Sequence, residues 1–267
     1  MSSMEQIDDL IAGYTDLKQY YEGVRDQIDT DLENFTESVS GTIRSHMIYE
    51  ALVDPELSES DVEARQFRSV AEVIERAAPG ALVDISIPAG RTVVIDSFTD
   101  VLSMFLQFSK SGSGANPILF IEAYLHPSGN NRLRNFRVRG NPTLLFDEVD
   151  IETGPKADDG AGWSTAGSSA IVETESAGGY VTVASRDNTV KVPDGELAFV
   201  SGRLGASAGT AMRNVTLDGV TVLRESPGSV YLLSGDGITL ENGASFYWEV
   251  EAPDGVVESI ANITDNT

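Results

Sequence analysis

The chain changes from helix-forming to strand-forming sequence within residues 67–90, which read FRSVAEVIERAAPGALVDISIPAG. Apolar residues recur at helical spacing from Phe67 to Ala77, and Pro79-Gly80 then forms a helix stop. The residues that follow, 82–95, cluster or alternate β-branched side chains, as strands do. This stretch therefore predicts a short helix that caps the start of a β-rich body.

The same stretch resembles the opening of pectin-lyase-like β-helix proteins. In that family a short helix is followed by a proline–glycine turn and by a first strand that ends in Pro-x-Gly. Here Pro79-Gly80 and Pro88-Ala-Gly90 stand at those places. Many phage tailspikes and virion fibre proteins share this opening, so the resemblance implies a β-helical virion fibre or tailspike. It carries no catalytic residue and therefore implies no activity.

A heptad repeat of apolar residues precedes this stretch. Its members form the predicted oligomer seam: Ile7, Leu10, Tyr14, Leu17, Tyr21, Val24, Ile28 and Phe35. A heptad repeat keeps one stripe facing a neighbouring helix, which is how a coiled coil forms. The register shifts after Asp31, as at a stutter. Because aromatic side chains are bulky for a two-stranded coil, we expect a homotrimer; a single amphipathic helix packed on its own body is the alternative.

The pattern divides the chain into five regions. They are a helical coiled-coil stalk for virion attachment (1–44), a connector (45–66), a β-rich region opened by the capping helix (67–153), a loop of small and polar residues (154–170) and a C-terminal β-rich region (171–267). Thus we expect a mainly β fold, with an α-helical stalk followed by a β-helix-like or other β-rich trimeric body.

A short repeat supports the β-helix. Val215-Thr-Leu-Asp-Gly219 is echoed 23 residues later by Ile238-Thr-Leu-Glu-Asn-Gly243. A repeat of this length fits one rung of a β-solenoid, whose stacked rungs bury a continuous core. A β-sandwich has similarly spaced strands and is the alternative fold.

The chain is strongly acidic, with a formal net charge of −24 from 42 acidic and 18 basic residues. Such a field repels phosphate backbones and anionic lipid surfaces, so we expect no nucleic-acid partner. The longest strongly apolar run, residues 101–108, is too short to span a bilayer, so we expect no membrane insertion. Residues 1–30 lack the pattern of a signal peptide, which predicts no export by that route.

The residues that usually carry catalysis are sparse. The sequence has no cysteine, which excludes disulfides and thiolate nucleophiles, and its two histidines, His46 and His126, stand far apart. Asp147, Asp150 and Glu152 lie in one strand-like run and offer the paired carboxylates of glycoside cleavage, although a solvated strand face is the simpler interpretation. We expect no enzymatic activity, no cofactor and no metal.

Two further groups are candidate contacts. Arg132, Arg134, Arg137 and Arg139 form the basic cluster of the sequence. Arg137 and Arg139 share one strand face and suit a carboxylate-rich ligand or a neighbouring acidic subunit. Tyr247 and Trp248 either stack on a sugar or pack in the core. We therefore take Arg137, Arg139, Tyr247 and Trp248 as possible intersubunit or ligand contacts.

Together these features predict a non-enzymatic structural fibre protein of a virion, placed on its tail or its head. Its N-terminal stalk would bind other virion proteins, and its homotrimeric body would bind a host-surface glycan or protein through weak sites multiplied by avidity. One rival is a tailspike-type polysaccharide depolymerase or lyase that uses paired carboxylates. A cellular adhesin or surface-layer protein is the other.

Overall fold

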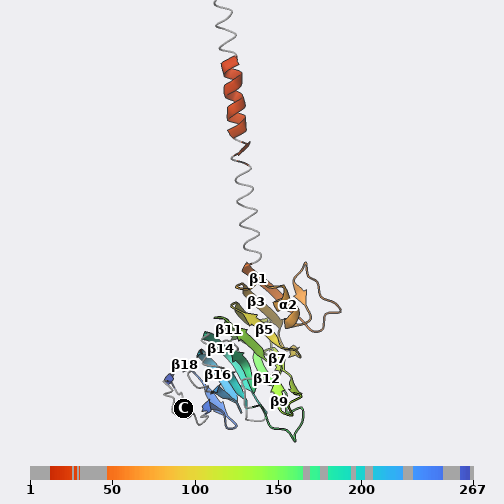
Figure 1. The fold of residues 1–267 in the computed structure, drawn as a ribbon, viewed down its shortest axis with the longest axis vertical. Helices are drawn as coiled ribbons and strands as arrows, with labels where there is room; N and C mark the ends of the chain where they lie inside the picture. Colours follow the sequence, from red (N-terminus) through yellow and green to blue (C-terminus); the bar gives the residue numbers. More distant parts are fainter. Residues whose placement is uncertain are drawn as a thin grey trace, which may run out of the picture. The chain divides into compact units, whose positions relative to one another are not determined.

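A computed structural model describes residues 13–25, 27, 28, 30, 47–164, 169–174, 180–193, 197–201, 207–224, 231–248 and 259–264. The chain forms two compact units, Met1–His46 and Met47–Thr267 (Figure 1). In the first unit, residues 13–25, 27, 28 and 30 are helical. Ile7, Leu10 and Phe35 of the predicted seam lie outside the described residues, as does His46.

The second unit is mainly β. Its described strands form a 13-stranded sheet, a 6-stranded sheet and a two-stranded hairpin. The largest sheet contains β1 (Ile48–Val53), β2 (Gln66–Phe67), β3 (Leu82–Pro88), β4 (Thr92–Ile95), β6 (Phe105–Ser111), β7 (Ile118–Ile121), β11 (Thr143–Asp147), β12 (Asp150–Thr153), β14 (Tyr180–Lys191), β16 (Ser207–Asp218), β18 (Tyr231–Asp236), β19 (Thr239–Glu241) and β21 (Ser259–Thr264). The second contains β5 (Thr99–Leu102), β10 (Phe136–Arg139), β13 (Ala170–Thr174), β15 (Ala198–Ser201), β17 (Thr221–Arg224) and β20 (Ser245–Trp248). The hairpin pairs β8 (Ala123–Leu125) with β9 (Asn131–Leu133).

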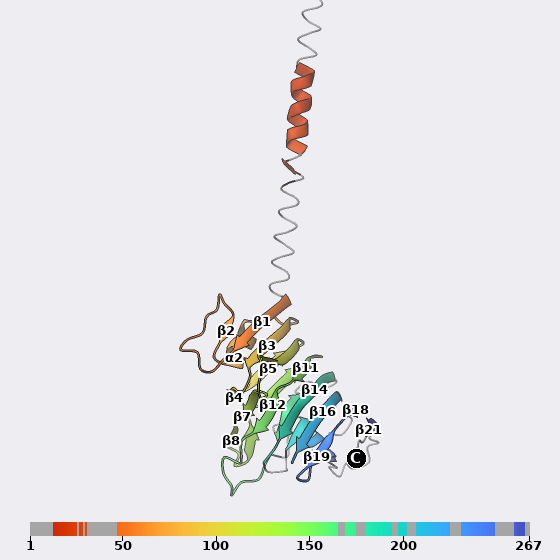
Figure 2. The same ribbon diagram turned by 180° about the vertical axis from the view of Figure 1, so that it is seen from behind.

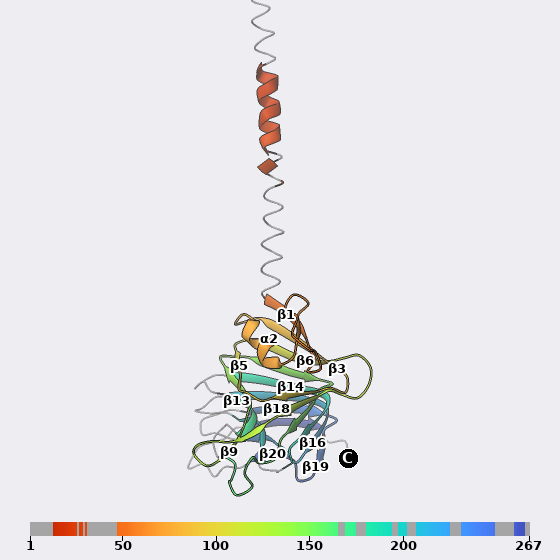
Figure 3. The ribbon, with the colours of Figure 1, turned by 90° about the vertical axis from the view of Figure 1, so that its right-hand side faces the viewer.

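The two larger sheets are built from parallel pairs. In the largest, Leu82 pairs with Phe105, Phe105 with Thr143, and Thr143 with Thr182. Each turn of the chain therefore lays one strand beside the strand of the turn before it, and the sheet curls (Figures 2 and 3). A curled parallel sheet is the arrangement of a β-helix or a half-barrel. The β-sandwich alternative is wrong for the described strands, because sandwiches are built from antiparallel sheets.

The sequence echo corresponds to one turn of this stack. Thr216 of β16 pairs with Thr239 of β19, and Leu217 pairs with Leu240. The same step of 23 residues joins Ser86 to Ser109, whose hydroxyls lie 3.4 Å apart. Other turns are longer because a loop is inserted between their strands, so the echo appears in the sequence only where the loops are short.

Left-handed backbone marks one corner of the stack. Glu148, Asp187, Asn214 and Gly237 have φ values of 54°, 53°, 52° and 67°. Each directly follows a residue of one paired column, which runs Asp147, Arg186, Arg213 and Asp236. Asn, Asp and Gly adopt this conformation most readily. The strand-like run predicted to contain Asp147, Asp150 and Glu152 is therefore divided in two, since Glu148 turns the chain between β11 and β12.

The capping helix is shorter than predicted. Helix α2 spans Val70–Arg76, and its Val70 and Val73 side chains are fully buried. Ser69 is the N-cap: its hydroxyl accepts a hydrogen bond from the Glu72 amide at 3.4 Å, which satisfies a donor that the helix leaves unpaired. Phe67, expected in this helix, lies instead in β2.

The predicted connector also requires correction. Residues 45–66 include β1, which pairs in parallel with β3 over five residues from Ile48 to Leu52. Apolar side chains at Ala51 and Val53 point into the core. The body therefore begins before the capping helix, since the second unit starts at Met47.

Aromatic rings fill the middle of the core. Phe108 of β6 and Phe146 of β11 are direct cross-strand partners, and their rings stack with centroids 5.3 Å apart and an interplanar angle of 3°. Phe136 and Phe199 lie 6.0 and 6.1 Å from Phe146. All four side chains are fully buried. This aromatic ladder connects the two larger sheets.

Candidate functional site

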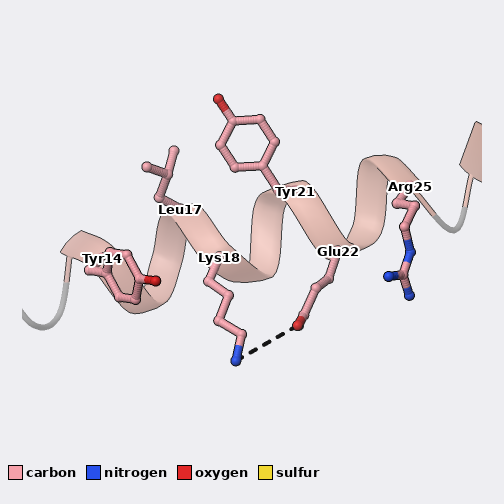
Figure 4. A pocket seen from close by; sticks show the side chains of 6 residues that line it. All are labelled: Tyr14, Leu17, Lys18, Tyr21, Glu22 and Arg25. Atoms are coloured by element: carbon pink, nitrogen blue, oxygen red, sulfur yellow. Dashed lines mark ion pairs between the residues drawn. The ribbon is translucent and has the colours of Figure 1, made fainter.

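The helix of the first unit carries the described part of the predicted seam on its surface. Five of its seam side chains are between 38% and 70% exposed: Tyr14, Leu17, Tyr21, Val24 and Ile28. Leu17 and Tyr21 project from one side of the helix, whereas Lys18 and Glu22 project from the other and form an ion pair of 3.9 Å (Figure 4). The helix is thus amphipathic, with large apolar side chains exposed along one stripe.

The second candidate site lies at the hairpin of β8 and β9. Tyr124 pairs with Arg132 in antiparallel register, and the Arg134 amide donates to the Glu122 carbonyl at 2.8 Å. Because alternate residues of a strand share a face, Tyr124, Arg132 and Arg134 belong to the same face of the hairpin. Phe98, Arg137 and His126 contact these side chains or each other, and we call the set the arginine–aromatic cluster: Phe98, Tyr124, His126, Arg132, Arg134 and Arg137.

Cation–π contacts hold the cluster together. The Arg134 guanidinium carbon lies 4.0 Å from the centroid of the Tyr124 ring and 5.7 Å from that of Phe98. The two rings meet edge to face, with centroids 5.8 Å apart. The Arg137 guanidinium carbon lies 4.2 Å from the Phe98 centroid. Guanidinium groups this close to an aromatic face are attracted by the ring quadrupole, so both arginines are held in defined positions.

The arginines of the cluster differ in their counter-charges. Arg137 forms an ion pair with Asp100, with Nη2 3.0 Å from Oδ1. In the part of the chain that the structure describes, no carboxylate forms an ion pair with Arg132 or Arg134. Their Nε atoms are buried and have no hydrogen-bond partner there. Thus Arg132 and Arg134 form no ion pair with the described residues, in a chain of net charge −24.

The contacts of His126 with Ser128 indicate which ring nitrogen carries the hydrogen. The Ser128 amide donates to Nδ1 of His126 at 3.1 Å, and the Ser128 hydroxyl lies 2.8 Å from the same atom. A nitrogen that accepts an amide hydrogen is unprotonated, so in neutral His126 the hydrogen is on Nε2. The ring lies 6.2 Å from Tyr124 and therefore adds an N–H donor at the edge of the cluster.

The four predicted contact residues all lie in strands of the 6-stranded sheet. Arg137 pairs with Asp100 on one side and Glu173 on the other. The same column of the sheet continues through Ser201 and Arg224 to Trp248. Arg137 and Trp248 thus occupy equivalent register positions, whereas Tyr247 occupies the next position along β20. The side chains of Tyr247 and Trp248 lie outside the described set.

Arg139 stands apart from the cluster. It is the exposed last residue of β10 and pairs with Leu102 of β5. The sequence prediction missed Phe98 and Tyr124, which hold the two central arginines. A signal for Tyr124 was present in the sequence. Tyr124-x-His126 and Arg132-x-Arg134 alternate on either side of a Pro-Ser-Gly turn, which is typical of a hairpin.

The carboxylates predicted as a catalytic alternative have separate partners. Arg186 binds Asp147, with Nε 2.7 Å from Oδ1, and this hydrogen bond raises the pKa of the Arg186 guanidinium. Lys191 lies 3.1 Å from Glu152. Asp150 accepts hydrogen bonds from the Thr189 amide at 2.8 Å and from Asn116 at 3.2 Å. Each carboxylate is therefore engaged by a group of its own.

Asn131 fixes the loop that follows β12. Its fully buried side chain donates to the carbonyls of Asp158 and Ala161 at 2.8 and 2.7 Å and accepts from the Asp158 amide at 3.0 Å. The acidic pair Asp158-Asp159 therefore lies in a loop anchored by backbone hydrogen bonds. Among the described residues, no group of three His, Cys, Asp or Glu side chains is placed to hold a metal ion.

Comparisons with family profiles, curated proteins and solved structures find no match to this chain. No helix in the described ranges is long and apolar enough to cross a membrane.

Proposed function

We propose that the protein is a non-enzymatic virion fibre protein of a tail or head. In this proposal the stalk forms a homotrimeric coiled coil and binds other virion proteins, and the β-helical body binds the host surface. The single observation that carries the proposal is the exposed apolar stripe on the first helix.

The energetics of that stripe favour self-association. Tyr14, Leu17 and Tyr21 are 70%, 50% and 62% exposed. Burial of a large apolar side chain is worth about 1.5–3 kcal/mol, so covering several of them in each of three copies is strongly favourable. The heptad spacing makes a second and third copy of the same helix the natural cover, because only a matching heptad keeps the stripe buried along its length.

The β body supports the same proposal through its architecture. Parallel rungs stacked along one direction give a stiff body of the kind that a fibre requires, and the aromatic ladder through Phe108 and Phe146 packs its interior. The opening at residues 67–90 resembles that of phage tailspikes and fibres, and this resemblance is the support for a virion location.

The partners of the carboxylates favour a non-enzymatic role. Asp147 and Glu152 are neutralised by Arg186 and Lys191. Glycoside cleavage needs two carboxyl groups that flank the scissile bond, whereas each of these two carboxylates is engaged by a cationic side chain of its own. Incubation with host capsule should release no oligosaccharide. Release that is lost in Asp150→Asn would instead support the depolymerase.

Sedimentation tests the stalk. At micromolar concentration we expect sedimentation to give a particle mass three times that of the full chain, which is 28.6 kDa. The double variant Leu17→Asp, Tyr21→Asp places charges in the stripe and should sediment as a monomer. The control Lys18→Gln, Glu22→Gln removes the ion pair of the same helix without placing a charge in the stripe, and should remain a trimer. A wild-type chain that is monomeric would overturn the proposal.

A second test concerns location. Density-purified virus particles from the source sample should contain the chain in a fixed ratio to the major structural proteins, measured by mass spectrometry. Its absence from particles, together with its presence on cell surfaces, would favour the adhesin.

A further inference from the structure

We propose that the arginine–aromatic cluster binds the carboxylate of an acidic sugar within a host-surface glycan. This inference rests on the proposed attachment function and names the class of ligand that the body would take. Its central residue is Arg134, and the observation behind it is a guanidinium that is held by aromatic rings, forms no ion pair with the described residues and has a buried Nε without a hydrogen-bond partner there.

Arg134 has the geometry of a prepared carboxylate receptor. The ring of Tyr124 supports its guanidinium group at 4.0 Å. A guanidinium stacked on a ring keeps its N–H donors in its own plane, where they suit a carboxylate with two parallel hydrogen bonds. Since the rings already order this side chain, binding costs little further conformational entropy.

Arg137 has a different role in the cluster. Its charge is compensated by Asp100 at 3.0 Å, and its guanidinium packs on Phe98. It thereby positions the ring that in turn contacts Tyr124 and Arg134. We therefore assign carboxylate binding to Arg134, assisted by Arg132, whose strand position is opposite Tyr124, and a positioning role to Arg137.

The remaining groups favour a sugar over a peptide. Tyr124, whose ring lies against Arg134, has a phenol, and His126, whose ring lies 6.2 Å from that of Tyr124, has an N–H at Nε2; sugar hydroxyls require such hydrogen-bonding groups. The Ser128 contacts fix the His126 ring through Nδ1 and direct the donor on Nε2 away from them. A small set of polar groups placed around aromatic rings is typical of small-ligand recognition.

The net charge of the chain limits how closely acidic sugars can be spaced along the ligand. A field of net charge −24 repels a polymer with a charge on every unit. A single carboxylate among neutral sugars gains the local interaction with Arg134 and Arg132 at a smaller long-range cost. The expected ligand is therefore a glycan in which acidic sugars are spaced by neutral ones, and not a polyuronate or a polyglutamate.

The test uses two probes that differ in one group. Methyl glucuronide carries a carboxylate where methyl glucoside carries a hydroxymethyl group. Each sugar is titrated into the full chain, and binding is measured by saturation-transfer NMR. The glucuronide should bind at least about tenfold more tightly than the glucoside, because its carboxylate accepts charge-assisted hydrogen bonds. Equal binding of the two sugars would overturn the proposal.

Three variants locate the site. Arg134→Gln should weaken glucuronide binding about tenfold or more and should reduce glucoside binding much less, because the glucoside has no carboxylate to lose a charge-assisted hydrogen bond. Arg134→Lys keeps the charge without the planar fork and should fall between wild type and Arg134→Gln. Arg139→Gln removes the same charge outside the cluster and should bind like wild type. Unchanged binding in Arg134→Gln, with a wild-type unfolding temperature, would contradict the assignment.

Two further readouts separate the possible failures. A tetraglutamate peptide that binds more tightly than the glucuronide, in an Arg134-dependent way, would replace the glycan with an acidic protein as ligand and overturn the proposal. Sedimentation of the same samples tests the fibre independently. A monomer that binds the glucuronide contradicts the fibre alone, whereas a trimer that binds neither sugar contradicts the site alone.

Discussion

The carboxyl of Asp84 lies on β3 beside Ser109 of β6, whose hydroxyl donates to it at 3.3 Å. Partial burial raises the pKa of Asp84, the Ser109 hydrogen bond partly opposes this, and the nearby Glu50 and Asp147 raise it further. A carboxyl whose pKa is higher in the folded state than its ordinary 3.8 favours folding only when protonated. At neutral pH its ionised form therefore destabilises the fold.

Asp84→Asn removes that destabilisation and keeps an oxygen that accepts from Ser109. We expect the variant to unfold at a higher temperature than wild type at pH 7. The difference should shrink as the pH falls through the raised folded pKa, and should vanish below the ordinary value, where both states of the wild-type carboxyl are protonated. Thermal unfolding from pH 7 to pH 3 measures it; a constant difference over this range would contradict the assignment.

Gly237 is required by both its backbone and its neighbour. It has φ of 67°, and a Cβ built on it would lie 2.6 Å from Oδ1 of Asn214, the corner residue one turn earlier. Gly237→Ala should cost about 2 kcal/mol or more of unfolding free energy, from left-handed strain plus the displaced asparagine. Gly243→Ala is the matched control, since Gly243 has φ of 82° and open space around its Cβ. Gly243→Ala should cost about 1 kcal/mol. Equal losses of unfolding free energy for the two variants, measured in urea, would show that the contact with Asn214 contributes nothing.

Among the elements, the paired strands β6 and β11 carry most of the aromatic packing. Phe146 touches three other rings, those of Phe108, Phe136 and Phe199. Phe146→Ala should lower the unfolding free energy by about 3–5 kcal/mol, because it leaves a cavity between the two sheets. Phe146→Leu retains most of the volume and should lose clearly less. Urea unfolding compares the two; a similar small loss in both would show that the rings are not tightly packed.

Elements with strong local signals were predictable from the sequence. The capping helix follows from the spacing of Val70 and Val73 before Pro79-Gly80, and the 23-residue echo matches the pairing of Thr216 with Thr239. The break at Glu148 was not predictable, because a left-handed conformation there is imposed by the stacked corner and not by a glycine. The arginine–aromatic cluster was predicted only in part, since stacking of distant strands brings Phe98 to Arg134 and Arg137.

At the scale of the whole molecule, charge opposes assembly. Each copy in the proposed trimer brings a net charge of −24. Salt screens this repulsion, with a Debye length that falls from about 30 Å at 0.01 M to about 8 Å at 0.15 M. The dissociation constant of the trimer should therefore fall by about tenfold or more between these conditions, as measured by sedimentation equilibrium. A trimer of equal affinity at both salt concentrations would contradict the expected repulsion.

In the largest sheet, the stacked strands β1, β3, β6, β11, β14, β16 and β18 follow the order of the chain, as do the six strands of the second sheet. During synthesis the ribosome consequently completes the template for each strand before it makes the strand that pairs with it. Folding can proceed from the N-terminal end as the polypeptide emerges, without waiting for distant sequence. A nascent chain arrested after β12 should therefore already resist protease over its earlier turns, while its last strand displays an open edge.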